Sequence, residues 1–133
     1  MLAETTAAVA GNSLNKGDVL ATARIAGIQA AKQASNLLPM SHPVLVGNVY
    51  VNFSIADTYI DVEASVDTVD RTGVEMEALV AVTVAALTIY DMCKSVDRTM
   101  TIGEVAIWEK SGGRSGTWRR EDAALEDDTL PEG

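Results

Sequence analysis

The feature that most constrains this sequence is a run of thirteen uncharged residues, Ala78 to Tyr90. Glu75 and Glu77 precede the run, and Asp91 and Lys94 follow it. Because the run is rich in Ala, Val and Leu, it predicts a helix that is apolar on nearly all sides and buried on most of them. Thirteen residues are too few to cross a bilayer, which takes about 20 apolar residues. We therefore expect a protein folded around this helix, without a membrane partner.

Two charged residues close this predicted helix. Asp91 lies near the C-terminal end, where the helix dipole disfavours a carboxylate, and Lys94 lies three residues further on the same face. A carboxylate and an amine held together in this way can transfer protons. The same spacing is that of an ordinary surface ion pair, so the spacing alone leaves both interpretations open.

At 133 residues the chain is long enough for one domain with a core of its own. It has a single cysteine, Cys93, and a single histidine, His42, so it has no internal disulfide and no metal-ligand cluster of the usual spacing. We therefore expect no resident metal. The sequence shows no signal peptide at its start, and the cytoplasm is the expected location.

The net charge of −9 is unevenly distributed. Six of the nineteen acids fall in the last thirteen residues, which leaves ten cations against thirteen acids before them. We divide the chain into a domain of residues 1–118 and an acidic tail of residues 119–133 that we expect to be disordered. The charge disfavours nucleic acid as a partner, and so does the lack of an exposed aromatic pair on the predicted strands.

Helices and strands can be assigned along most of the chain. Residues 1–9 predict a short helix, and a longer one follows over residues 19–36, with Asp18 as its N-cap. Small residues recur at three- and four-residue spacings along this helix and allow close packing (Ala23, Gly27, Ala30, Ala34). Residues 49–55 and 60–66 alternate between apolar and polar, which predicts an antiparallel hairpin with one buried face. Residues 101–110 predict a further strand with a bulge near Gly103.

This order predicts an α+β protein: an antiparallel sheet covered on one face by two long helices. It corresponds to a ferredoxin-like α/β sandwich that lacks its first strand. Because the sheet has an open edge and the central helix is apolar on nearly all sides, we expect another subunit to cover them.

Two segments outside these elements carry candidate site residues. His42 lies between Pro39 and Pro43, which hold it in a stiff extended segment; it is either a binding residue or an ordinary packing residue. The loop Lys110 to Gly116 combines two cations with three glycines and could cradle a phosphate. A solvated linker has the same composition, and the loop lacks the Walker A pattern.

Five motifs in order resemble the MoaC family and together cover roughly residues 2–118. They are KGDVLATARIAGIQAAK at 16–32, HP at 42–43, TGVEMEAL at 72–79, ALTIYDMCK at 86–94 and KSGGRSG at 110–116. The resemblance implies a cyclic pyranopterin monophosphate synthase, a lyase of molybdenum cofactor biosynthesis. Such an enzyme converts 3′,8-cyclised dihydro-GTP, made by a radical SAM partner enzyme, into the cyclic phosphate and releases pyrophosphate. The resemblance also implies a ferredoxin-like subunit in a homohexamer, a trimer of dimers, with active sites between subunits.

The resemblance assigns roles to residues of this chain. Asp91 and Lys94 match the catalytic pair of the family, which serves the proton transfers that the ring rearrangement needs. The substrate-binding residues it implies are Lys16, Arg24, Met40, Ser41, His42, Met76, Glu77, Lys110 and Arg114. Cations among them suit a triphosphate, which magnesium could accompany, and Glu77 could accept from the guanine-derived amino group.

The chain departs from the family pattern in two places. Ser41 stands where the family usually has a cysteine, and we expect this change to be mild because serine keeps a donor and an acceptor. The family also has, ahead of this chain's first residue, a segment with a Met-Val-Asp-Val strand that contributes to the site. The absence of this segment indicates either a truncated chain or a shortened paralogue. Both departures favour an alternative function, a catalytically weak paralogue that acts as a ligand-binding or assembly subunit.

Overall fold

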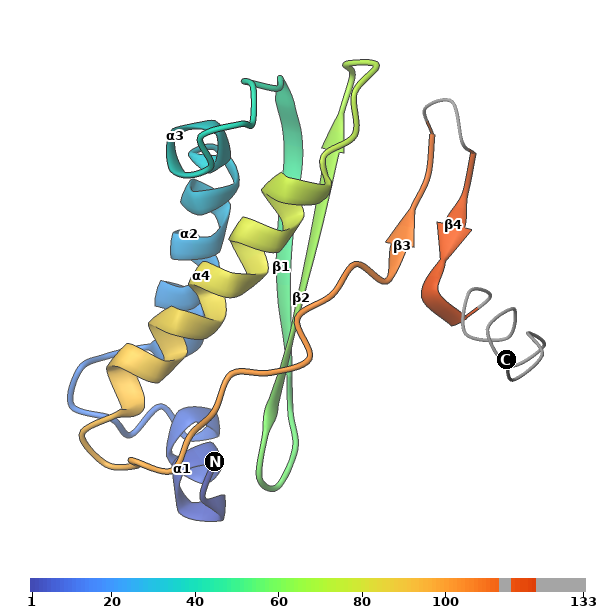
Figure 1. Ribbon diagram of the computed structural model, residues 1–133. Coiled ribbons are helices and arrows are strands. Elements are labelled where there is room, and N and C mark those ends of the chain that lie inside the picture. The colour runs from blue at the N-terminus through green and yellow to red at the C-terminus, as the bar shows by residue number, and fades with distance from the viewer. Residues whose placement is uncertain (113–115, 122–133) are drawn as a thin grey trace.

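The computed structural model describes residues 1–112 and 116–121. Helices α2 and α4 lie in one layer, and the hairpin of β1 and β2 lies behind them (Figure 1). The predicted α+β architecture, with antiparallel strands packed against helices, is therefore confirmed. In chain order the elements are α1 (Ala3–Ala10), α2 (Val19–Ala31), α3 (Ala34–Leu37), β1 (Val46–Ile55), β2 (Ile60–Thr68), α4 (Glu75–Cys93), β3 (Glu109–Lys110) and β4 (Trp118–Arg119).

The β1–β2 hairpin follows the predicted alternation. Its antiparallel register runs from Ile55 opposite Ile60 to Val46 opposite Thr68, with one irregularity between Val46 and Val49. Val51 is buried in the core, whereas Tyr50 beside it is more than half exposed, because successive side chains of a strand point to opposite faces. One face of the hairpin therefore packs under the helices and the other is polar.

Helix α2 begins where the sequence predicts it. The Asp18 carboxylate accepts a hydrogen bond from the Ala21 amide at 3.0 Å and caps the first turn. The helix ends earlier than predicted, at Ala31 rather than Asn36. The amides of Lys32 and Gln33 bond three residues back, to Gln29 and Ala30, and this tighter turn separates α2 from α3.

Gly27 explains how closely α2 and α4 approach. A Cβ at this position would lie 3.0 Å from the Ala81 carbonyl oxygen, 3.1 Å from Val51 and 3.2 Å from Ala85. The small residues of the predicted stripe therefore sit in the contact between the two helices, and Ala23, Ala30 and Ala34 of that stripe are also buried.

Helix α4 extends beyond the uncharged run at both ends. It begins with Glu75 to Glu77 and ends with Asp91 to Cys93. Within the described residues it is the one helix long and apolar enough to cross a membrane, a property that core helices of soluble proteins share. It packs on α2 and on both long strands. Only 33% of its most apolar window is buried within this chain.

The prediction of a strand over residues 101–110 is wrong for most of this range. Only Glu109 and Lys110 form a strand, β3, and it pairs with β4 instead of the β1–β2 sheet. Glu104 has a positive φ of 56°, which interrupts extended backbone where a bulge was expected. The residues before Glu109 have no neighbouring strand among the described residues, and the β3–β4 hairpin stands apart from the sheet (Figure 1). The acidic-tail prediction lies outside the described residues from 122 onward.

Asp97, a buried residue that the sequence analysis did not single out, links the N-terminal residues to the segment that follows α4. The Asp97 carboxylate accepts hydrogen bonds from the Leu2 amide (2.8 Å) and the Thr5 hydroxyl (2.9 Å). It also accepts from the amide (2.9 Å) and the hydroxyl (2.7 Å) of Thr99. These donors, the Leu2 amide first, hold the pKa of Asp97 well below its usual range. Asp97 therefore fixes α1 against the segment that follows α4.

Candidate functional site

An open groove of about 530 Å³ lies at the N-terminal end of α4. Its walls come from two segments far apart in the sequence, residues 38–44 after α3 and residues 72–77 at the start of α4. The two prolines keep the first segment out of any helix, so it passes in front of the first turn of α4. Five residues predicted from the sequence to bind substrate line this groove: Met40, Ser41, His42, Met76 and Glu77.

Glu77 is the groove residue whose surroundings most favour a bound ligand. Its side chain is only 5% exposed, and it forms no hydrogen bond or ion pair within the described residues. It also lines a second, smaller cavity beside Lys32 and Pro43. Every fully buried side-chain N or O atom of the described residues has a hydrogen-bond partner. Because the Glu77 carboxylate has no partner among these residues, its oxygens are not fully buried and still reach solvent through these openings. A nearly buried carboxylate without a partner is costly, and a bound hydrogen-bond donor would offset that cost.

A second acid of the same helical turn closes one side of the groove. The Glu75 carboxylate pairs with Lys110 of β3 at 2.6 Å, and this hydrogen bond lowers the pKa of Glu75. The same carboxylate folds back over Gly73, where a Cβ would collide with it. Lys110, predicted to bind phosphate, is thereby held beside the groove. Glu75 was not predicted as a site residue, and its position in the first turn of a helix was the only signal for it.

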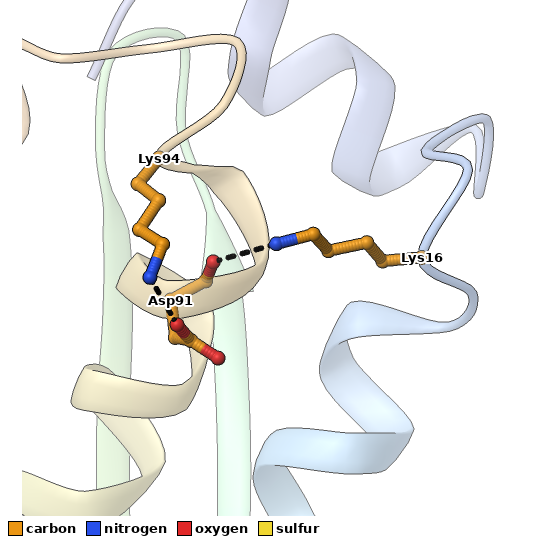
Figure 2. Close-up of polar contacts among 3 residues, drawn as sticks. All are labelled: Lys16, Asp91 and Lys94. Carbon is orange, nitrogen blue, oxygen red and sulfur yellow. Dashed lines mark hydrogen bonds and ion pairs between the residues drawn. The ribbon is translucent and has the colours of Figure 1, made fainter.

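Asp91 and Lys94 form the predicted ion pair at the opposite end of α4 (Figure 2). The Lys94 ammonium lies 2.7 Å from Asp91 Oδ1, and both side chains are more than half exposed. This hydrogen bond lowers the pKa of Asp91 and raises that of Lys94, so both groups are charged near neutral pH. Lys16, from the loop before α2, reaches the Asp91 backbone carbonyl at 3.4 Å. Three predicted residues thus gather at this end.

One predicted cation, Arg24, lies outside both groups. Arg24 of α2 donates from Nε to the Val51 carbonyl at 2.8 Å, and its guanidinium lies 5.7 Å from the centre of the Phe53 ring. Its contacts within this chain therefore join α2 to β1. Arg114 lies outside the described residues.

The predicted site is thus divided into two half-sites within one chain. We call the groove residues Met40, Ser41, His42, Met76 and Glu77 the groove half-site, and Lys16, Asp91 and Lys94 the charged half-site. Glu77 and Asp91 are fourteen residues apart on one helix, which corresponds to about 21 Å along its axis. The two half-sites therefore lie at opposite ends of α4, and no single side chain spans the distance between them.

The described residues contain no group of three or more His, Cys, Asp or Glu side chains that could hold a metal ion. Cys93 is fully buried in the core, where burial raises the pKa of its thiol. The predicted site residues in the described part of the chain therefore offer carboxylates, amines, a guanidinium group, an imidazole and a hydroxyl.

Comparison with known proteins gives a consistent result. The sequence model of the MoaC family matches residues 1–113. A cyclic pyranopterin monophosphate synthase of Thermomicrobium roseum is 61% identical over 109 residues, which are 80% of this chain and 66% of that protein. Synthases of the same name from Thermoanaerobacter sp. (52% identical, 91% of this chain, 78% of that protein) and Roseiflexus sp. (57%, 87% and 75%) are similar over comparable lengths.

Proposed function

The chain belongs to the MoaC family, and we propose that it acts as a cyclic pyranopterin monophosphate synthase, a lyase of molybdenum cofactor biosynthesis. The observation that carries this proposal is the 61% identity to the Thermomicrobium roseum synthase. Apart from Ser41 in place of the family cysteine, the described residues and the relatives add nothing in favour of a catalytically weak paralogue.

The proposed substrate is a small nucleotide-derived molecule, 3′,8-cyclised dihydro-GTP. Its conversion opens the five-membered ring of the purine, closes a pyrazine ring and forms a cyclic phosphate with loss of pyrophosphate. These steps move several protons, which requires groups that donate and accept them at fixed positions. The ammonium of Lys94 is such a donor and the carboxylate of Asp91 such an acceptor, and their contact of 2.7 Å orients both.

The groove half-site is suited to the base of this substrate. Glu77 offers a nearly buried carboxylate, which would accept hydrogen bonds from the guanine-derived amino group. Ser41 is half-buried in the same wall and keeps a hydroxyl where the family usually has a thiol. The triphosphate needs cations and N–H donors. Lys16, Lys110, Arg114 and His42 would supply these, with Arg24 once its contacts to β1 are exchanged. Magnesium would arrive with the triphosphate as part of the substrate.

The separation of the half-sites supports an active site shared between copies of this chain. One copy would supply the groove half-site and the next copy the charged half-site, within the homohexamer that the resemblance implies. A radical SAM enzyme would supply the substrate, and the cytoplasm is the proposed location of both.

A coupled assay tests this proposal. The radical SAM enzyme makes the cyclised GTP derivative in situ, the protein is added, and the pterin formed is oxidised and measured by fluorescence. The parent protein should form pterin, and Asp91→Asn should lower the rate by about 100-fold or more, as expected for loss of a proton-transfer group. Asp61→Asn, an exposed acid on the outer face of β2, is the matched control and should keep the parent rate. Folded, assembled parent protein that forms no pterin would contradict the synthase function and favour the weak paralogue.

A further inference from the structure

The two exposed methionines of this chain line one groove. Met40 is 95% exposed in the proline-flanked segment after α3, and Met76 is 41% exposed in the first turn of α4. Both belong to the groove half-site, and each comes from a different wall of the groove. Methionine is among the residues most often buried in protein cores, so this exposure is unusual. The sulfur atoms in the groove are open to small reagents from solvent.

The other sulfur atoms of the chain are protected. Met92 and Met100 are only 8% and 7% exposed in the core, and the thiol of Cys93 is fully buried. Met1 is half-buried, with its side chain packed against the core and its ammonium group bonded to the Thr58 carbonyl at 2.8 Å. All five methionines and the one cysteine lie within the described residues, so this comparison covers every sulfur atom of the chain.

The groove also lacks the thiol that the family usually carries there. Ser41 stands at that position, half-buried beside Met40. A thiol is oxidised in steps to products that become irreversible, whereas a thioether is oxidised to a sulfoxide that can be reduced again. The oxidisable sulfur groups of this groove are therefore two thioethers, and their oxidation can be undone.

We propose that Met40 and Met76 form a site of reversible oxidation within the groove. A peroxide transfers one oxygen atom to each thioether sulfur: the S–O bond forms as the peroxide O–O bond breaks, and hydrogen peroxide leaves water behind. Each sulfur loses two electrons, which the peroxide gains. A methionine sulfoxide reductase reverses the step. Two thiols then supply two electrons and two protons and become a disulfide, and the oxygen leaves as water.

Oxidation changes the walls against which a ligand packs. Leu38, Pro39 and Val44 make these walls largely apolar together with the two thioethers. A sulfoxide is polar and adds an acceptor oxygen, although the ionised Glu77 carboxylate in the same groove already offers only acceptors. The oxidised groove should therefore bind a flat base less tightly. This effect on turnover rests on the proposed function, whereas the position of the oxidised residues does not.

Peptide mapping after limited peroxide treatment tests the site without substrate. Mass spectrometry of the folded parent protein should show an added oxygen at Met40 and Met76, with Met92 and Met100 modified about fivefold more slowly or less. In denaturant all of these methionines should react alike, because the difference comes from burial. Equal rates at the exposed and the core methionines of the folded protein would overturn the proposed site.

The coupled assay measures the consequence for turnover. Oxidised parent protein should have a KM about five- to tenfold higher with kcat nearly unchanged, as for a loss of binding, and the reductase should restore it. The KM of Met40→Leu/Met76→Leu should not respond to peroxide, relative to its own untreated value, whereas Met100→Leu should respond like the parent.

Two results would contradict the effect on binding. One is an unchanged KM in parent protein that carries both sulfoxides, and the other is an equal rise of KM in the double variant, which would place the damage elsewhere. Because the mapping needs no turnover, it decides the oxidation site even if the synthase assay fails, and it can fail while the synthase activity stands.

Discussion

At the scale of single residues, burial decides what two aspartates six positions apart can do. Asp91 is exposed and pairs with one exposed lysine, so its ion pair contributes little to stability and its carboxylate stays accessible. Asp97 is 2% exposed and accepts four hydrogen bonds, all from neighbouring backbone and threonine groups. The Asp91 carboxylate is therefore accessible to a ligand, whereas the Asp97 carboxylate stabilises the fold.

Replacement of Asp97 should accordingly lower stability and leave the chemistry of the site intact. We expect Asp97→Ala to reduce the midpoint of thermal unfolding by several degrees, because it leaves four donors without their acceptor. Asp61→Asn, at an exposed position of β2, is the control and should leave the midpoint unchanged. An Asp97→Ala protein as stable as its parent in calorimetry would show that this network does not hold α1 in place.

The same carboxylate predicts how stability depends on pH. Its pKa is lowered on folding, so its contribution is present above the ordinary aspartate pKa of about 3.9 and is lost as the pH falls through the folded pKa. Denaturant unfolding of the parent should therefore show a loss of stability from about pH 5 downward, and Asp97→Asn should flatten that loss. An equally steep acid dependence in both proteins would assign it to other carboxylates.

At the scale of elements, the contact between α2 and α4 depends on Gly27. A larger side chain there would strike the Ala81 carbonyl, Val51 and Ala85, all of them parts of packed elements. Gly27→Val should therefore lower the free energy of unfolding by about 1–3 kcal/mol, as overpacking does. Ala21→Val, on the exposed side of the same helix, should cost less than about 0.7 kcal/mol. Equal losses in the two variants, measured by denaturant unfolding, would contradict the close approach.

The elements also show where prediction from sequence succeeds. Periodicity located the hairpin and α4, and the small-residue spacing located the face of α2 that packs, because these are local patterns with one physical cause each. Prediction failed for residues 101–108, whose alternation is that of a strand but which have no strand beside them among the described residues. Strand formation needs a hydrogen-bonded partner, and a single sequence does not show whether one is present.

At the scale of the whole molecule, sequence motifs identified the candidate site residues but not their arrangement. The predicted helix already implied that Glu77 and Asp91 lie about 21 Å apart, but the sequence did not show which segments pack beside each of them. Two further features depend on segments distant in sequence: Glu77 is nearly buried with no partner among the described residues, and Glu75 pairs with Lys110.

If one active site needs two copies of the chain, subunit complementation should restore activity to a mixture of two damaged proteins. Asp91→Asn damages the charged half-site and Glu77→Gln the groove half-site, so each protein alone should be nearly inactive in the coupled assay. When equal amounts are unfolded and refolded together, half of the pairs are mixed, and each mixed pair has one undamaged site. A shared active site predicts recovery of roughly a quarter of the parent activity. No recovery, with mixed pairs demonstrated by differential tags, would contradict a shared active site.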